Sequence, residues 1–219
     1  IGHASETIAR VGEKVVAAAV SSMPELVDAV GLTDEERRLV SYDPGYARAS
    51  TSSRLDAFLL PDRLAFAEYN AEAPAGLGYT ENLAELFDAL PIMARFREHF
   101  EARHHRLGAG ILAALLESYR EWGGTASPPQ VLITDFRGVP TWNEFLILQE
   151  RFTSLGVPTV VADPRDLEFD GRHLHAGGRR IDLVYRRVLI NDIVAQPDDC
   201  RALVDAYRAN AVCVANTFR

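Results

Sequence analysis

The sequence predicts an α/β protein with a helical N-terminal layer, a β-hairpin and a subdomain built on a parallel or mixed sheet. Three observations lead to this prediction. Apolar residues recur at helical spacing near the start of the chain, two strand-like runs follow at 53–60 and 64–70, and a strand–helix–strand pattern occupies 131–162. A strand–helix–strand unit ordinarily has parallel strands joined by a right-handed crossover.

Residues 123–129, GGTASPP, form the clearest linker in the chain, because Gly, Ser and Pro interrupt both helical and strand patterns. We expect this linker to separate two parts. The first, 1–122, holds the helical layer and the hairpin, and the second, 130–219, holds the sheet.

The composition is that of an ordinary globular protein: 47% of the 219 residues are hydrophobic and 25% are charged. The net charge of −8 argues against nucleic acid or an anionic membrane as the main partner. No apolar run is long enough for a membrane span and no signal peptide is visible, so we expect a cytoplasmic protein. Cys200 and Cys213 have no redox or metal motif around them, and we expect inert, reduced thiols.

The first part begins with predicted helices. Apolar residues keep helical spacing from Ala4 to Ser21, and Pro24 to Val30 continues as a short helix that ends at Gly31. Thr33 followed three residues later by Glu36 is a capping box, which predicts the start of another helix.

The hairpin is the most informative stretch. Ser53–Leu60 and Leu64–Asn70 are separated by Pro61-Asp62-Arg63, which is typical turn chemistry. If the turn is centred on Asp62, residues that lie equally far before and after Asp62 in the sequence face each other across the two strands. The hairpin therefore has a testable register.

In that register Asp56 lies opposite Glu68, and Arg54 lies opposite Asn70. All four side chains then share one face, because strand side chains alternate with period two. Two carboxylates and a carboxamide are the hard oxygen ligands that suit Mg²⁺, and an arginine beside them can hold a phosphoryl oxygen.

Two alternatives remain open at this point. The charged face can be a solvated surface on which Arg54 pairs locally with a carboxylate. A two-residue turn at Pro61-Asp62 would instead pair Asp56 with Ala67, and a one-residue slip moves a side chain to the other face of a strand.

The spacing Arg54-x-Asp56, eleven residues, then Glu68-x-Asn70 resembles the metal-binding hairpin of circularly permuted ATP-grasp ligases of the glutathionylspermidine synthetase type. The resemblance implies that Asp56, Glu68 and Asn70 hold Mg²⁺ on the phosphates of ATP. It also implies that Arg54 steadies the transferring phosphoryl group as a catalytic residue. In that family the next loop borders the peptide substrate, which implies a cofactor or substrate contact at Gly76.

Helices are predicted between hairpin and linker: one capped by Thr80 and running to about Leu90, one beginning at Pro91, and one from Leu107 to Trp122. They separate the hairpin from the sheet.

The second part contains buried-strand runs at Val131–Thr134 and Pro158–Ala162 with a helix between them at Thr141–Leu155. The turn after the first strand lacks GxGxxG, so we do not expect a dinucleotide site of the Rossmann type. A helix at Pro197–Ala209 and a strand at Val212–Ala215 complete the pattern.

A hairpin with an Asp-Gly turn is predicted at 167–175, with His173 and His175 on an edge strand. The strand Arg180–Arg186 follows and delivers Arg186 and Arg187 to a strand end. This arginine pair can bind a carboxylate or phosphate, or it can form structural ion pairs with Asp182 or Asp192.

The run from Val131 to Asp192 also resembles the pre-ATP-grasp domain of the same superfamily. There, ATP is held by lysines that follow a segment resembling Asn216–Arg219, whereas the only lysine here is Lys14. We therefore expect the chain to be a fragment that lacks the C-terminal ATP-binding part.

The resemblance implies an ATP-dependent carboxylate–amine ligase that forms an amide bond through an acyl phosphate. Its partners would be a small peptide or amino-acid carboxylate and an amine, with Mg²⁺ as cofactor and ATP as co-substrate. The alternative is a non-catalytic module that binds substrate and has lost ATP binding.

Overall fold

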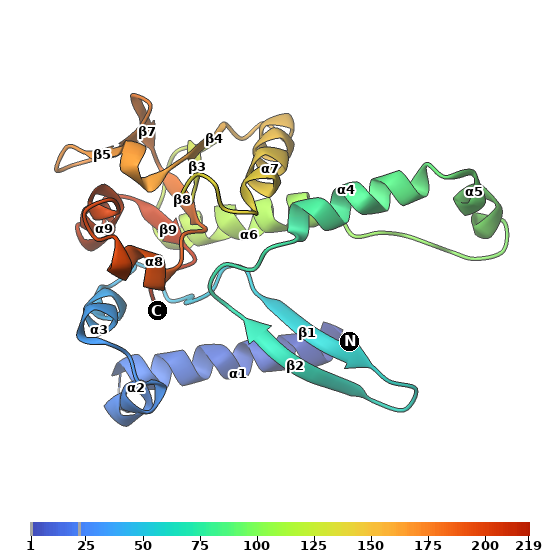
Figure 1. Cartoon of the computed structure of the whole chain (residues 1–219), viewed down its shortest axis with the longest axis horizontal. Helices are drawn as coiled ribbons and strands as arrows, with labels where there is room; N and C mark the ends of the chain where they lie inside the picture. Colours follow the sequence, from blue (N-terminus) through green and yellow to red (C-terminus); the bar gives the residue numbers. More distant parts are fainter. Residues whose placement is uncertain (1, 22) are drawn as a thin grey trace.

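The computed structural model describes residues 2–21 and 23–219 and has a mixed α/β architecture (Figure 1). The helices are α1 (Gly2–Ser21), α2 (Pro24–Val30), α3 (Asp34–Ser41), α4 (Leu77–Asp88), α5 (Pro91–Arg97), α6 (Leu107–Glu121), α7 (Trp142–Ser154), the 3₁₀ turn η1 (Pro164–Asp166), α8 (Ile190–Ala195) and α9 (Arg201–Arg208). The strands are β1 (Arg54–Leu59), β2 (Leu64–Asn70), β3 (Val131–Thr134), β4 (Thr159–Ala162), β5 (Leu167–Phe169), β6 (Leu174–Ala176), β7 (Arg179–Ile181), β8 (Leu183–Arg186) and β9 (Cys213–Ala215).

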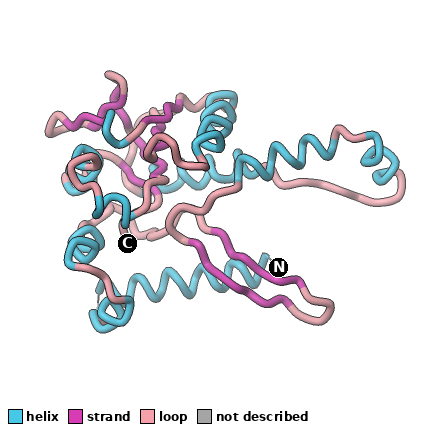
Figure 2. The backbone as a smooth tube through the Cα atoms, in the orientation of Figure 1, coloured by secondary structure: helices cyan, strands magenta, loops and turns pink. Residues whose placement is uncertain are grey.

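The central element is a four-stranded sheet of order β4-β3-β8-β9, in which all neighbouring strands are parallel. The predicted strand–helix–strand unit is confirmed as β3, α7 and β4. A second sheet, β5-β6-β7, is antiparallel, and the hairpin β1-β2 forms a sheet of its own. In Figure 2 the hairpin extends away from the parallel sheet, on the same side of the molecule as α1.

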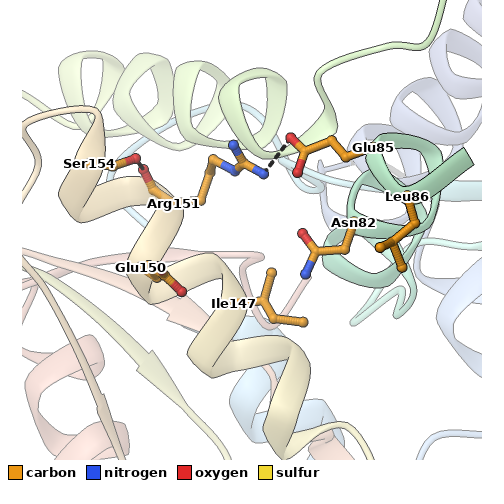
Figure 3. A pocket seen from close by; sticks show the side chains of 7 residues that line it. All are labelled: Asn82, Glu85, Leu86, Ile147, Glu150, Arg151 and Ser154. Atoms are coloured by element: carbon orange, nitrogen blue, oxygen red, sulfur yellow. Dashed lines mark hydrogen bonds and ion pairs between the residues drawn. The ribbon is translucent and has the colours of Figure 1, made fainter. Parts of the chain in front are cut away.

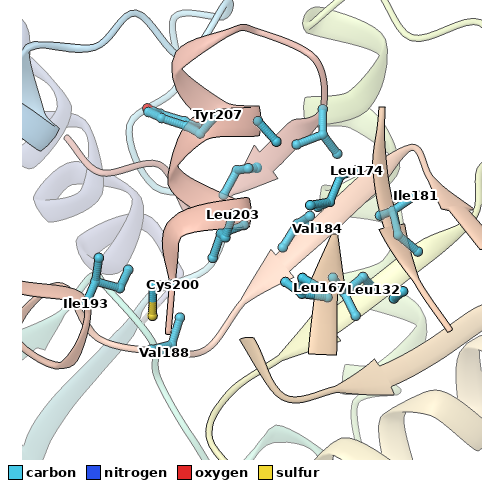
Figure 4. Packing of buried hydrophobic residues seen from close by; sticks show 14 of the residues in the cluster. Leu132, Leu167, Leu174, Ile181, Val184, Val188, Ile193, Cys200, Leu203 and Tyr207 are labelled. Atoms are coloured by element: carbon cyan, nitrogen blue, oxygen red, sulfur yellow. The ribbon is translucent and has the colours of Figure 1, made fainter. Parts of the chain in front are cut away.

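Each face of the parallel sheet has its own hydrophobic core, because successive strand residues point to opposite faces. Leu132 and Val184 pack with α9 and the small antiparallel sheet, as Figure 4 shows. Ile133 and Tyr185 face the other way and pack with α6 and α7. Helix α6, which precedes the linker at 123–129, therefore shares a core with strands that follow it.

Several local predictions hold. Thr33 and Glu36 form the capping box of α3, and α2 ends at Gly31, whose φ of 75° is left-handed. Both cysteines are free and buried, and burial raises the pKa of the Cys200 and Cys213 thiols to about 12.

Three boundaries were predicted wrongly. The predicted strand Arg180–Arg186 is two strands, because Ile181 ends β7 in the antiparallel sheet and Leu183 begins β8 in the parallel sheet. Thr80 does not cap α4 but lies inside it, and its N–H donates to the carbonyl of Gly76. The last helix begins at Arg201, after the separate helix α8.

The histidine strand was also misplaced. β6, which carries His175, is the central strand of its sheet and not an edge strand. His175 Nε2 lies 3.0 Å from Asp170 Oδ2, and that carboxylate also accepts the backbone N–H groups of Arg172 and His173. The two histidines thus belong to the turn structure of this hairpin.

The N-terminal helix α1 approaches the hairpin closely. An added Cβ at Gly12 would lie 3.0 Å from Cε1 of Tyr69, so this glycine allows the close approach of α1 to the ring of Tyr69. None of the helices in the described ranges combines the length and apolar character that a membrane span requires.

Candidate functional site

The hairpin register places the four predicted residues as expected. Arg54 pairs with Asn70 and Asp56 pairs with Glu68 in the antiparallel ladder. Directly opposed residues lie on the same face, so the two carboxylates, the carboxamide and the guanidinium share one surface.

The predicted turn centred on Asp62 is wrong, and the alternative two-residue turn is present. The turn has two residues, Pro61 and Asp62, because the N–H of Leu60 donates to the carbonyl of Arg63 at 2.9 Å. Such a turn alone would pair Asp56 with Ala67. The register shifts between Asp56 and Ala57, so that Ala67 becomes the extra residue of a β-bulge and Glu68 is restored to its place opposite Asp56.

Arg54 is held in a fixed position on this face. Its Nε donates to Oδ1 of Asp56 at 2.8 Å, its Nη2 donates to Oδ2 at 3.3 Å, and its Nη1 donates to the carbonyl of Ala75 at 2.9 Å. The hydrogen bond to Asp56 raises the pKa of Arg54. The local ion pair that was the alternative interpretation is therefore present, and it coexists with the predicted register.

Glu68 and Asn70 are not engaged in the same way. Among the described residues, neither the Glu68 carboxylate nor the Asn70 carboxamide has a hydrogen-bond or ion-pair partner, and Asn70 Nδ2 is buried. Glu68 is exposed. The face thus combines one paired carboxylate with two oxygen-bearing groups that are free to bind something else.

A cavity of about 440 Å³ adjoins this face. Arg54, Asn70 and Leu189 line it together with the loop 71–75 that follows β2. In the described ranges, no three His, Cys, Asp or Glu side chains gather as a metal site, so any metal here would rely on two carboxylates and a carboxamide. That donor set fits Mg²⁺, which usually takes one or two protein carboxylates and completes its shell with phosphate and water.

The backbone N–H of Gly76 is already hydrogen-bonded within the protein. Its N–H donates to both carboxylate oxygens of Glu144, at 2.9 and 3.0 Å, and the N–H of Gly78 donates to the same group at 3.1 Å. Glu144 comes from α7 and is only 1% exposed. Its negative charge therefore fills the anion position at the N-terminus of α4, and Gly76 shapes the loop without offering a free N–H.

The arginine pair at the end of β8 also holds this loop. Arg186 is fully buried, and its Nη1 donates to Glu72 Oε1 at 2.9 Å. Arg187 Nη1 donates to the carbonyl of Pro74 at 2.6 Å, and its Nε is buried without a partner. The predicted ion pairs with Asp182 or Asp192 are wrong, because these hydrogen bonds to the hairpin loop take their place.

Asn216, which sequence reasoning missed, connects the hairpin to the sheet. It follows β9 and is 1% exposed. Its Oδ1 accepts the N–H groups of Thr51 and Ser52 at 2.7 and 2.9 Å. Its Nδ2 donates to the carbonyls of Ser52, Ala71 and Glu72 at 2.8, 2.8 and 2.7 Å. A polar residue at the carboxyl end of a strand was the signal that could have found it.

The same edge carries buried carboxylates after β3 and β4. Asp135 is 7% exposed, and desolvation by burial raises its pKa to about 6. Asp163 is fully buried, and its hydrogen bond from Arg165 holds its pKa well below the usual range. The carboxyl edge of the sheet is therefore its charged edge.

A groove of about 640 Å³ lies elsewhere, between α4 and α7 (Figure 3). Arg151 bridges it by donating to Glu85 at 2.8 Å, and Leu86 and Ile147 line it. No predicted site residue lies among its lining residues, so the hairpin face remains the candidate site.

The fold and the site define an α/β protein in which a charged hairpin face and its loop are attached to the carboxyl edge of a parallel four-stranded sheet. No protein-family model matches the sequence, and no curated protein matches it either. The function is therefore inferred from these residues.

Proposed function

We propose that the protein is an ATP-dependent carboxylate–amine ligase, with Mg²⁺ held by Asp56, Glu68 and Asn70 and with Arg54 as the phosphoryl contact. The observation that carries the proposal is the register Asp56 opposite Glu68 and Arg54 opposite Asn70, which gathers these groups on one face beside a cavity. The resemblance of the parallel-sheet region to a pre-ATP-grasp domain supports the same proposal.

The availability of Glu68 and Asn70 supports metal binding. The exposed carboxylate of Glu68 leaves an oxygen ligand available to the metal. The Nδ2 of Asn70 is a buried donor without a partner among the described residues, so it leaves an N–H available for an external acceptor such as a phosphate oxygen. When bound, Mg²⁺ would supply charge stabilisation to the phosphates of ATP.

Arg54 is placed for a second role. Two of its nitrogens contact Asp56 and the third contacts Ala75, so the guanidinium is oriented before any substrate arrives. Such preorganised cations stabilise the charge that develops during phosphoryl transfer.

The proposed reaction needs no protein nucleophile. An oxygen of the substrate carboxylate bonds to the γ-phosphorus and ADP leaves; the amine nitrogen then bonds to the acyl carbon, inorganic phosphate leaves, and the amine loses a proton. The substrate class is a small peptide or amino-acid carboxylate together with an amine.

Mn²⁺ as a paramagnetic probe tests the metal assignment. We expect water-proton relaxation to show binding by the wild type and at least about 10-fold weaker binding by Glu68→Gln, because loss of a group that merely supports a metal ligand already costs about 10- to 100-fold. The matched control is Asp62→Asn, which removes an exposed carboxylate from the turn of the same hairpin and should bind as the wild type does. Equal binding by all three proteins would refute the assignment.

Calorimetric titration of Mg²⁺-ATP and a measurement of amine-dependent ADP release test the activity. Release of ADP that requires both acid and amine, and that Glu68→Gln abolishes, is the expected result. The single lysine, Lys14, favours the second candidate, a substrate-binding module without ATP chemistry. Peptide binding without heat from Mg²⁺-ATP, both in this chain and in the full-length protein, would support that module and exclude the ligase.

A further inference from the structure

Residues 83–106 form an arm that projects from the body of the protein, with α5 at its far end (Figure 1). Polar contacts hold the arm together. Asp88 accepts a hydrogen bond from Arg97 and lies 2.8 Å from Nδ1 of His104, which ties the returning segment to α4. No apolar core serves this purpose, because α5 has no buried residue and the buried residues of α4, Gly78 and Glu81, lie near its start.

The arm exposes its apolar side chains. Leu83, Leu86, Phe87 and Leu90 recur at i, i+3, i+4 and i+7, and they are 55%, 67%, 53% and 45% exposed. We call these four residues the apolar stripe. Such a stripe normally faces a core.

Three further exposed apolar residues follow the apolar stripe beyond α4. Ile92, Phe96 and Phe100 follow at a spacing of four and are 64%, 44% and 59% exposed, with the two phenylalanine rings stacked at 4.7 Å. An arm of two short helices without a core is marginal in water. It therefore needs a surface against which to pack.

We propose that the apolar stripe, together with Ile92, Phe96 and Phe100, is the contact surface of a two-fold symmetric dimer, in which the stripes of two copies pack against each other as antiparallel helices. A stripe of Leu and Phe at this spacing is self-complementary, as the heptad-like seams of paired helices are. A two-fold dimer needs only one such patch, because each copy presents the same surface.

The exposed area is sufficient for this partner. At about 150 to 200 Å² for a fully exposed large side chain, the seven apolar residues of the arm offer about 600 to 750 Å² per copy. A standard interface buries about 800 Å² per partner, and polar neighbours contribute the remainder. Because the arm projects from the body, two copies can approach without contact between their sheets (Figure 2).

Sedimentation velocity over a range of protein concentrations tests the dimer. The wild type is expected to sediment as a dimer. In the double variant Leu86→Glu, Leu90→Glu, the dissociation constant is expected to rise at least tenfold, because dimer formation would bury unpaired carboxylates. The matched control is Leu59→Glu at the tip of the hairpin, which is 73% exposed in the wild type and should leave the dimer intact. A wild type that is monomeric at every concentration overturns the proposal, as does a dimer that the double variant leaves unchanged.

Thiol labelling gives a second measurement that does not depend on a charged substitution. Both native cysteines are fully buried, so a cysteine introduced at the surface reports alone. In Leu90→Cys, labelling should slow as the protein concentration rises, whereas in Leu59→Cys it should not. Concentration-independent labelling at both positions would contradict a dimer formed through the stripe. This proposal does not depend on the ligase activity.

Discussion

Individual buried charges determine how the candidate site is built. Arg186 is surrounded by acceptors: Glu72, the carbonyl of Val188 at 2.6 Å, and the carbonyls of Asn216 and Thr217 at 3.1 and 2.9 Å. Burial lowers its pKa, and the charge of Glu72 opposes that effect. A buried guanidinium is tolerated when its donors are satisfied in this way. Arg186 is thus a structural support of the loop, and Glu72 is the residue that it fixes.

Asp135, unlike Arg186, is a buried ionisable group with few compensating hydrogen bonds. Its one hydrogen bond from a described residue comes from the N–H of Phe136, at 2.8 Å, and its pKa is raised to about 6 by desolvation. In the unfolded chain the same carboxyl has a pKa of about 3.9. The folded state therefore binds more protons than the unfolded state between these two values.

The resulting prediction concerns the pH dependence of stability. Between about pH 4 and 6 the contribution of Asp135 to the free energy of unfolding should fall as pH rises, because folding favours its neutral carboxyl. Asp135→Asn keeps the neutral shape. We expect it to be more stable than the wild type at pH 7, by on the order of 1 to 3 kcal/mol, and equally stable below about pH 4. Urea denaturation across this pH range measures the difference, and a pH-independent difference would contradict the assignment.

At the scale of elements, the junction between β2 and α4 depends on a residue from a third element. Gly76 has a φ of 104°, which favours glycine and turns the chain into α4 without a Ser, Thr, Asp or Asn cap. Glu144 of α7 supplies the missing acceptor for the N–H groups of Gly76 and Gly78. Helix α7 therefore positions the loop that borders the candidate site.

Replacement of Glu144 tests this role. Glu144→Ala leaves buried N–H groups without acceptors, and we expect the free energy of unfolding to fall by about 1 to 3 kcal/mol. Glu144→Gln retains one carbonyl oxygen and should lose less. Glu150→Ala, an exposed position on the same helix, serves as the control and should change stability by no more than about 0.5 kcal/mol. Equal effects of the three substitutions in urea denaturation would exclude a capping role for Glu144.

At the scale of the whole molecule, the hairpin is attached to the parallel sheet mainly through polar groups. Asn216 bonds to the chain on both sides of the hairpin, before β1 and after β2, while Arg186 and Arg187 bond to the loop that follows. The two sheet cores, by contrast, are apolar. The position of the site relative to the sheet therefore depends on a few hydrogen bonds around one carboxamide.

Hydrogen exchange measures this attachment. In Asn216→Ala we expect the amides of β1 and β2 to lose protection, whereas those of β3 and β8, whose core is untouched, should retain most of theirs. Asn143→Ala, at an exposed position on α7, is the matched control and should leave both regions unchanged. An equal loss of protection in the hairpin and in the parallel sheet would show that Asn216 stabilises the fold as a whole and does not specifically hold the hairpin.

Local patterns in the sequence determined much of this protein. The capping box of Thr33 and Glu36, the strand–helix–strand unit and the two segments of the hairpin depend on contacts between residues close in the chain, and the structure confirms them. The pairing of Asp56 with Glu68 was also predicted, but from a turn centred on Asp62 that the structure does not have; the bulge at Ala67 produces the pairing instead. The identity of a metal or substrate at that face remains a proposal.

Tertiary packing decided the rest. The division of 180–186 between two sheets and the partners of Arg186 and Asn216 depend on residues that are far apart in the sequence. A buried charge takes whichever acceptor the folded chain brings within reach, and no local spacing specifies that acceptor. The sequence alone therefore determined which groups share the hairpin face, whereas the tertiary structure decided what holds that face against the sheet.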